Sequence, residues 1–280
     1  MNVADLLDVS AREAPARDAI IAPDGRGGWT RVTYAGLNAA VDGCARALRA
    51  RGVAPDERVL VMVPPGIPLI TLFYGLLWMG AVPVMIDPGM GFQAFLKCVA
   101  TTEATSLVGI PKAHVARLLF PRAFSTVRRR FVVGPSPLGL LGERLDPFAK
   151  GAPDATSPRE EKRPDDLAAI LFTSGSTGPA KGACYSVRNF HAQKDALLKL
   201  YGFRPGEVDL AAFPLFSLFD AALGMTSVIP DIDPARPASC NPGKIAEAIE
   251  THRATSAFGS PAIWSRVAPW AAANGVRLKG

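Results

Sequence analysis

The stretch that decides the fold is residues 58–86, RVLVMVPPGIPLITLFYGLLWMGAVPVMI. No charged residue follows Arg58 in it, so by hydropathy alone it resembles a membrane-spanning helix. Proline and glycine divide it, however, into a strand-like run at 58–63, a helix-length run at 67–79 and a second strand-like run at 81–86. About 13 helical residues reach about 20 Å, which is less than a hydrocarbon core of about 30 Å. We therefore predict a βαβ unit with two buried parallel strands, and no transmembrane segment.

The same alternation of strand-like and helical patterns continues along the chain. Further strand-like runs occupy 106–110, 130–133, 168–172, 208–213 and 255–258. Helical patterns occupy 34–51 (capped by Thr33 and closed by Gly52), 92–100, 113–120, 187–200 and 242–252. This order predicts an α/β fold of stacked, largely parallel sheets with flanking helices. We interpret the proline-rich stretch 134–164 as a long loop, and expect one α/β subdomain over 1–150 and a second over 151–280.

Composition excludes several classes of protein. The chain has 280 residues, of which 49% are hydrophobic and 20% charged, so it holds enough apolar material for a core and is not a disordered sequence. Its four cysteines lie far apart without a CxxC pair, which argues against a zinc site and a disulfide framework. Acidic residues stand near the N-terminus, where a secretory leader would be basic. We expect no leader and a cytoplasmic location.

The formal net charge of +6 is concentrated in one segment. Residues 112–163 contain eleven basic side chains: Lys112, Arg117, Arg122, Arg128, Arg129, Arg130, Arg144, Lys150, Arg159, Lys162 and Arg163. The same segment has five acids, and this excess of six equals the charge of the whole chain. No aromatic residue interleaves with the arginine cluster 128–130, as it would in a stacking platform for nucleic acid. A solvated basic surface is the first interpretation and attraction to anionic lipid the second.

The most informative segment for chemistry is residues 168–182, AAILFTSGSTGPAKG. An apolar strand runs directly into a loop rich in glycine and hydroxyl side chains that ends in a lysine. Glycines let backbone N–H groups approach phosphate oxygens, hydroxyls add donors, and the lysine adds a mobile positive charge. The predicted phosphate-binding residues are Thr173, Ser174, Gly175, Ser176, Thr177, Gly178 and Lys181.

This loop is not a Walker A motif. That motif needs glycine before the lysine and serine or threonine after it to hold magnesium, whereas Ala180 and Gly182 occupy those positions. Any magnesium must therefore be held from elsewhere.

The ten-residue run 173–182, TSGSTGPAKG, resembles the signature phosphate loop of the adenylate-forming superfamily, which includes acyl-CoA synthetases, luciferases and peptide-synthetase adenylation domains. Supporting segments occur in the same order as in that family. They are 32–37 (VTYAGL), 76–88 (LLWMGAVPVMIDP), 213–216 (FPLF) and 259–261 (GSP). The resemblance covers essentially the whole chain.

The resemblance implies that a carboxylate attacks the α-phosphate of ATP, giving acyl-AMP and pyrophosphate, with Mg²⁺ as cofactor. By carry-over, the loop from Thr173 to Lys181 would hold the β- and γ-phosphates and stabilise the departing pyrophosphate. The family's adenine-binding, magnesium-binding and ribose-binding elements and its catalytic lysine would lie beyond Gly280. We therefore expect the N-terminal part of such an enzyme, with no catalytic residue of its own and with little activity alone. A C-terminal half or other enzymes of the pathway are possible partners.

Two departures from the family point to one branch of it. Ser217 stands where many relatives have histidine after Pro-Leu-Phe, and Val187 replaces another frequent histidine. Segments 217–220 and 224–237 most resemble bacterial enzymes of olefin biosynthesis, which close adenylates of 2-alkyl-3-hydroxy acids to β-lactones without coenzyme A. Long-chain acyl-CoA ligase chemistry is the alternative, and a non-catalytic fragment that binds nucleotide or acyl chain is another.

The resemblance places an acyl pocket in the second subdomain. Its expected residues are Phe216, Phe219, Asp220, Gly259 and Ser260. Phe213, Leu223 and Met225 extend this apolar pattern, which is equally compatible with ordinary core packing. Asp220 would recognise a substrate hydroxyl or, alternatively, be a surface or capping aspartate.

Other polar residues receive no catalytic role. The histidines His114, His191 and His252 are isolated on helical patterns. Asp231 and Asp233 could pass for a metal pair, but their proline neighbours favour a turn. We assign no metal ligand.

Overall fold

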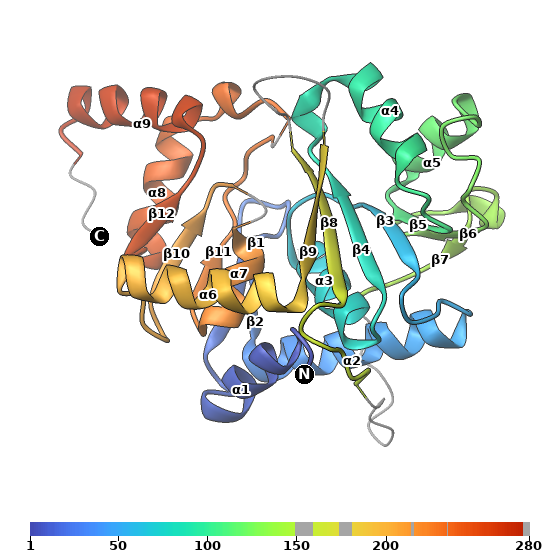
Figure 1. Cartoon of the computed structure of the whole chain (residues 1–280). Coiled ribbons are helices and arrows are strands. Elements are labelled where there is room, and N and C mark those ends of the chain that lie inside the picture. Colours follow the sequence, from blue (N-terminus) through green and yellow to red (C-terminus); the bar gives the residue numbers. More distant parts are fainter. Residues whose placement is uncertain (149–158, 174–180, 214–215, 234, 277–280) are drawn as a thin grey trace. The chain divides into compact units, whose positions relative to one another are not determined.

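The computed structural model describes residues 1–148, 159–173, 181–213, 216–233 and 235–276 (Figure 1). The chain divides into two compact units. Unit 1 consists of Met1–Asp5, Ala39–Pro64 and Thr71–Ala192, and unit 2 of Leu6–Asn38, Pro65–Ile70 and Gln193–Gly280. Each unit thus draws on separate stretches of sequence. The subdomains 1–150 and 151–280 are a different division, which stays a prediction.

Unit 1 is built on a sheet of seven strands within the described residues. In spatial order they are β7 (Glu143–Arg144), β6 (Arg129–Val132), β5 (Ser106–Gly109), β3 (Arg58–Met62), β4 (Val82–Ile86), β8 (Leu167–Thr173) and β9 (Lys181–Ser186). All neighbours are parallel except β8 and β9, which are antiparallel. Figure 1 shows β4, β8 and β9 side by side. The predicted βαβ unit is confirmed, since α3 (Ile67–Trp78) connects β3 to β4.

The centre of this sheet is buried on both faces, as its uninterrupted apolar sequence requires. Val59 and Leu60 on β3 are fully buried, and every residue of β4 is buried. Side chains from α4 (Phe92–Thr101), including Cys98 and Val99, pack with Leu60 and with β4 in one cluster. Helix α5 (Pro111–Leu119) packs against β5.

The stretch expected to be a plain loop, 134–164, contains regular structure. It includes the short 3-10 helix η2 (Pro137–Gly139) and the edge strand β7. The strand can approach its neighbour because Gly142 lacks a side chain. A Cβ atom there would lie 2.6 Å from the carbonyl oxygen of Arg130. The interpretation of 134–164 as a long loop or linker missed these short elements, because a glycine contact, which hydropathy does not reveal, pairs part of the segment with β6.

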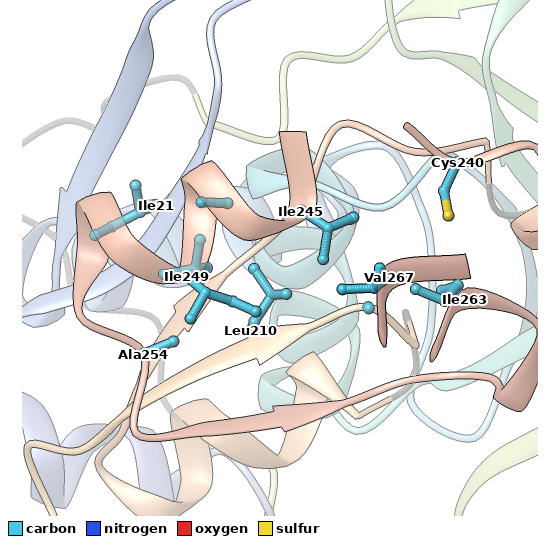
Figure 2. Packing of buried hydrophobic residues seen from close by; sticks show 11 residues of the cluster. Ile21, Leu210, Cys240, Ile245, Ile249, Ala254, Ile263 and Val267 are labelled. Atoms are coloured by element: carbon cyan, nitrogen blue, oxygen red, sulfur yellow. The ribbon is translucent and has the colours of Figure 1, made fainter. Parts of the chain in front are cut away.

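Unit 2 is built on a sheet of five strands, again within the described residues. In spatial order they are β12 (Ser256–Phe258), β10 (Val208–Ala211), β11 (Thr226–Val228), β1 (Asp18–Pro23) and β2 (Trp29–Thr33). Only β1 and β2 are antiparallel. Helices α8 (Pro242–His252) and α9 (Pro261–Ala273) bury Ile245, Ile249 and Val267 against this sheet (Figure 2).

The remaining elements are shorter or connect these sheets along the chain. They are α1 (Asp5–Glu13), α2 (Tyr34–Ala50), η1 (Pro88–Met90), α6 (Val187–Tyr201), α7 (Ser217–Leu223) and η3 (Pro237–Ser239). The predicted cap of α2 is confirmed, because the Thr33 hydroxyl accepts a hydrogen bond from the Gly36 amide at 3.1 Å. Among the described residues, no helix has both the length and the apolar character needed to cross a bilayer. The predicted fold class, largely parallel sheets with flanking helices, is confirmed.

A buried tyrosine ties α2 to the strand-bearing part of unit 2. Tyr34 is fully buried, and its hydroxyl donates a 2.7 Å hydrogen bond to the carbonyl of Met225, directly before β11. We predict that Tyr34→Phe lowers the free energy of unfolding by about 1 to 3 kcal/mol, because the Met225 carbonyl is left buried without this donor. Chemical denaturation measures the change. Tyr201→Phe is the matched control, since Tyr201 is 57% exposed and should tolerate the change with little effect. Equal effects of the two substitutions would contradict this role.

Candidate functional site

The two ends of the predicted phosphate loop are adjacent in unit 1. Thr173, the last residue of β8, pairs in register with Lys181, the first residue of β9. The residues between them, including Ser174, Gly175, Ser176, Thr177 and Gly178, lie outside the described residues, and of Thr173 only the backbone is described. The structure therefore describes the two strand ends that flank the predicted loop, which we call the base of the loop.

This base lies at the carboxyl edge of the parallel strands. Ile86, which ends β4, is in register with Phe172 of β8, and the Asp87 amide donates to the Phe172 carbonyl at 2.9 Å. Asp87 then turns the chain into η1, its Oδ1 accepting from the Gly89 amide at 2.8 Å. In open α/β sheets, ligands bind outside this edge of the strands. Sequence reasoning did not single out Asp87, although an acid directly after a buried strand is a usable signal.

A packing contact explains why glycine follows the loop's lysine. A Cβ atom on Gly182 would lie 2.8 Å from Cζ of Phe172 and 3.0 Å from the Ile170 side chain. A serine or threonine, as in a Walker A motif, would therefore clash at this position. Lys181 itself is exposed, and no ion pair to its ammonium group is seen in the described part of the chain. The sheet thus presents this charge toward solvent, where an anion can reach it.

In unit 2, parallel pairing of β10 with β12 brings the two predicted acyl-pocket segments together. The Phe213 amide donates to the Phe258 carbonyl at 3.0 Å, and the Phe216 ring stacks on that of Phe258 with centroids 4.3 Å apart. Gly259 fits closely, since a Cβ atom there would lie 3.0 Å from Cβ of Ala212. Ser260 caps α9, with its hydroxyl accepting from the Ala262 amide at 3.3 Å.

The apolar residues named for this region differ in how far they are exposed to solvent. Leu223 and Met225 are buried in the core of unit 2, so the core interpretation holds for them. Phe216 and Phe219 are also buried, whereas Phe213 is partly exposed. The pocket role of Phe216, Phe219, Gly259 and Ser260 stays a prediction.

Asp220 belongs to a buried acidic pair. It lies on α7, it is fully buried, and neither carboxylate oxygen has a hydrogen-bond partner in the described structure. The interpretation as a surface aspartate is therefore wrong. Asp209 on β10, also fully buried, accepts a 2.7 Å hydrogen bond from the Ser256 hydroxyl. Sequence reasoning missed Asp209, although a charged residue inside an apolar strand is a signal of a special environment.

Burial and mutual repulsion shift the titration of this pair. Burial raises the pKa of Asp209 to about 6. Burial, with the charge of Asp209 as a second cause, raises the pKa of Asp220 well above its ordinary value. The pair therefore retains a proton under conditions where exposed aspartates are ionised.

Other polar candidates are structural. Asp233 accepts from the Ala235 amide at 3.0 Å and pairs with Arg236, while Asp231 pairs with Lys244. These contacts support the turn interpretation. Within the described residues, no group of three or more His, Cys, Asp or Glu side chains could hold a metal ion. The Nε2 atom of buried His114 lies 3.0 Å from the Phe131 carbonyl.

Comparison with known proteins gives consistent results. The family model described as "AMP-binding enzyme" matches residues 7–278. Olefin beta-lactone synthetases of Stenotrophomonas maltophilia and Xanthomonas campestris pv. campestris are 42% and 40% identical to the chain, each over 94% of it and 48% of their own length. The chain thus spans about half the length of these relatives. A crystal structure of a long-chain-fatty-acid-CoA ligase (FadD1) from Archaeoglobus fulgidus has the same fold, with a TM-score of 0.81, 21% identity, and 98% of this chain and 54% of that chain covered.

The buried acidic pair predicts a pH-dependent stability. Because the folded pKa values lie above those of the unfolded chain, the native state binds more protons from about pH 4 upward, and stability falls as pH rises toward neutrality. The loss for Asp209, whose pKa rises from 3.8 to about 6, is roughly 3 kcal/mol. The Asp220→Asn variant lacks the repulsion between the two carboxylates, so its free energy of unfolding should decline less steeply as pH rises. Its stability relative to the unsubstituted protein should therefore be higher at pH 7.5 than at pH 5. Urea denaturation at the two pH values measures this.

The matched control for this prediction is Asp165→Asn, which changes an exposed carboxylate paired with Arg188. It should leave the pH dependence unchanged. An Asp220→Asn profile that parallels the unsubstituted protein would contradict the acidic pair.

Proposed function

Because the chain belongs to the AMP-binding enzyme family, we propose that the protein uses ATP to convert a long-chain carboxylic acid into an acyl-adenylate with release of pyrophosphate. In this reaction a carboxylate oxygen attacks the α-phosphorus, and the bond to the bridging oxygen breaks as pyrophosphate leaves. The observation that carries the proposal is the phosphate-loop sequence between paired Thr173 and Lys181 at the carboxyl edge of the unit-1 sheet. An exposed ammonium group at that edge can offset the charge that develops on the departing pyrophosphate.

We further propose that the acid is a 2-alkyl-3-hydroxy fatty acid and that its adenylate closes to a β-lactone in olefin biosynthesis. The similarity to two olefin beta-lactone synthetases supports this substrate class. The predicted acyl pocket would use Phe216, Phe219 and Gly259, and Asp220 would recognise the hydroxyl. We propose a cytoplasmic location and cooperation with other enzymes of that pathway. All four cysteines are free, which suits a reducing compartment.

Magnesium is not assigned a role in these steps. Gly182 leaves no room for the hydroxyl that holds magnesium in a Walker A loop, and the described residues offer no cluster of three potential ligands. We therefore propose that the Mg²⁺ implied by the resemblance is held by residues other than those described here. The described residues supply the two strand ends that flank the predicted loop and the positive charge of Lys181.

Lys181→Ala tests the loop assignment. We predict that kcat/KM for ATP falls by an amount equivalent to about 1 to 3 kcal/mol, the scale of one lost charged hydrogen bond. ATP-dependent pyrophosphate exchange reports the change. The assay uses the whole protein as the cell produces it, and a 3-hydroxy fatty acid is added as substrate. Lys199→Ala, which removes an exposed lysine from the last turn of α6, is the matched control and should be silent. An unchanged ATP dependence of the Lys181 variant would overturn the assignment.

Coenzyme A distinguishes the proposal from its alternative. Long-chain acyl-CoA ligase chemistry, which the sequence resemblance left open, is the second candidate. We predict a β-lactone product whose formation is independent of coenzyme A. Mass spectrometry of products formed with and without coenzyme A makes the distinction, because the ligase would give a thioester. Absence of both products and of pyrophosphate exchange would instead favour a non-catalytic binding module.

A further inference from the structure

The strongest feature outside the proposed site is an arginine-lined cavity at the β6–β7 edge of unit 1. It has a volume of about 280 Å³ and is lined by Arg51, Arg128, Arg129 and Arg130 together with Gly139 and Glu143. These side chains come from the end of α2, the start of β6 and the η2–β7 segment. Most of them belong to the basic segment 112–163 that holds the excess charge of the chain.

Acidic residues offset only part of this charge. Arg51 pairs with Glu143 at 2.5 Å, and Arg129 pairs with Glu57 at 3.1 Å. Arg128 and Arg130 are exposed, and the described part of the chain shows no ion pair to either. The cavity therefore has two positive charges that remain available to an external anion.

A neighbouring arginine adds to this imbalance. Arg117 on α5 lies close enough to Arg130 that its pKa is lowered, first by burial and second by that like charge. Its Nε and Nη2 atoms are buried without a hydrogen-bond partner among the described residues. Like charges held this close favour binding of a negatively charged group.

The loop that closes the cavity presents leucine side chains to solvent. Gly139 lines the cavity, and its two neighbours, Leu138 and Leu140, are 95% and 74% exposed. Two exposed large apolar side chains therefore stand directly beside the residues that line a basic cavity. This is the combination that interfacial membrane binding uses, in which apolar residues enter the lipid boundary and basic residues contact headgroups.

The loop holds these leucines in a fixed turn. The Ser136 hydroxyl donates to the Gly142 carbonyl at 3.0 Å, and the Gly139 amide donates to the Ser136 carbonyl at 3.1 Å. Leu138 has a left-handed backbone, with φ of 50°, which leucine adopts only at an energetic cost. In this turn the Leu138 side chain is exposed.

We propose that this edge of unit 1, comprising the arginine cavity and the leucines at 138 and 140, docks on the surface of an anionic lipid bilayer. Arg128 and Arg130 contact the lipid phosphates, and the two leucines enter the boundary between headgroups and acyl chains. Charge complementarity selects an anionic surface, and the exposed leucines select a bilayer over a soluble anion. The docking is independent of adenylation, since no residue of the predicted phosphate loop takes part.

Vesicle co-sedimentation tests this docking. The full chain is mixed with vesicles of phosphatidylcholine alone or with phosphatidylglycerol added. We expect binding to the anionic vesicles only. Arg128→Gln with Arg130→Gln should weaken it about tenfold or more, since each basic residue near a bilayer contributes about fivefold. Leu138→Ser with Leu140→Ser should weaken it to a similar extent.

Matched controls distinguish binding through this surface from binding that depends only on the total positive charge of the protein or on any exposed apolar side chain. Arg12→Gln with Arg26→Gln removes two arginines from elsewhere on the chain, and Leu200→Ser removes a leucine that is 73% exposed on α6. Both variants should bind as the unsubstituted protein does, and circular dichroism verifies that all variants are folded. Equal loss in the controls, or no preference for anionic vesicles, would overturn the proposal.

Two other occupants would give distinct results. If glycerol phosphate competes with the vesicles and the leucine variant binds normally, the cavity is a site for a soluble anion and membrane docking is wrong. If the leucine variant changes a dimer into a monomer in analytical ultracentrifugation while vesicle binding is absent, the leucines contact a second copy of the chain. That result would overturn the proposal as well.

Discussion

The rest of unit 1 depends on burial of its parallel sheet from both sides. Strand β4 has no exposed residue, and Val59 and Leu60 of β3 are fully buried, so helices must cover both faces. Parallel strands joined in this way have their carboxyl ends at one edge. Burial of apolar sequence therefore fixes where polar loops emerge, and the predicted phosphate loop follows β8 at that edge beside the end of β4.

A second constraint acts at the single antiparallel pair of that sheet. Because β9 returns alongside β8, residue 181 must lie opposite residue 173, and the Phe172 ring occupies the space beside Gly182. The same packing that buries Phe172 therefore excludes a hydroxyl side chain after the lysine. The departure from the Walker A pattern, visible in the sequence as a substitution, has its physical cause in this cross-strand contact.

The sequence predicted unit 1 better than unit 2, for a physical reason. Long apolar runs such as those of β3, β4 and β8 carry a strong signal, and all three strands occur where they were expected. Strands β1, β2 and β11 and helices α1, α7 and α9 were not predicted, and neither were the edge strands β7 and β9 of unit 1. These elements are short or of mixed polarity and gain their stability from tertiary contacts. For the candidate site, sequence supplied the predicted loop and the predicted acyl-pocket segments. The surroundings of Asp209 and Asp87 needed structure, because the residues they contact, Ser256 and Phe172, are distant in sequence.

The buried acid Asp220 lowers the stability of unit 2, and core packing does not require it. Asp220 occupies a helix whose other faces pack in an apolar core, so its carboxyl group destabilises unit 2 near neutral pH instead of stabilising it. An apolar residue such as leucine would serve core packing at that position without burying a carboxyl group. An unpartnered buried acid beside Asp209 is therefore a cost that folding does not explain. Such costs concentrate where a polar ligand group must be recognised, which agrees with the predicted pocket formed by the segments that follow β10 and β12.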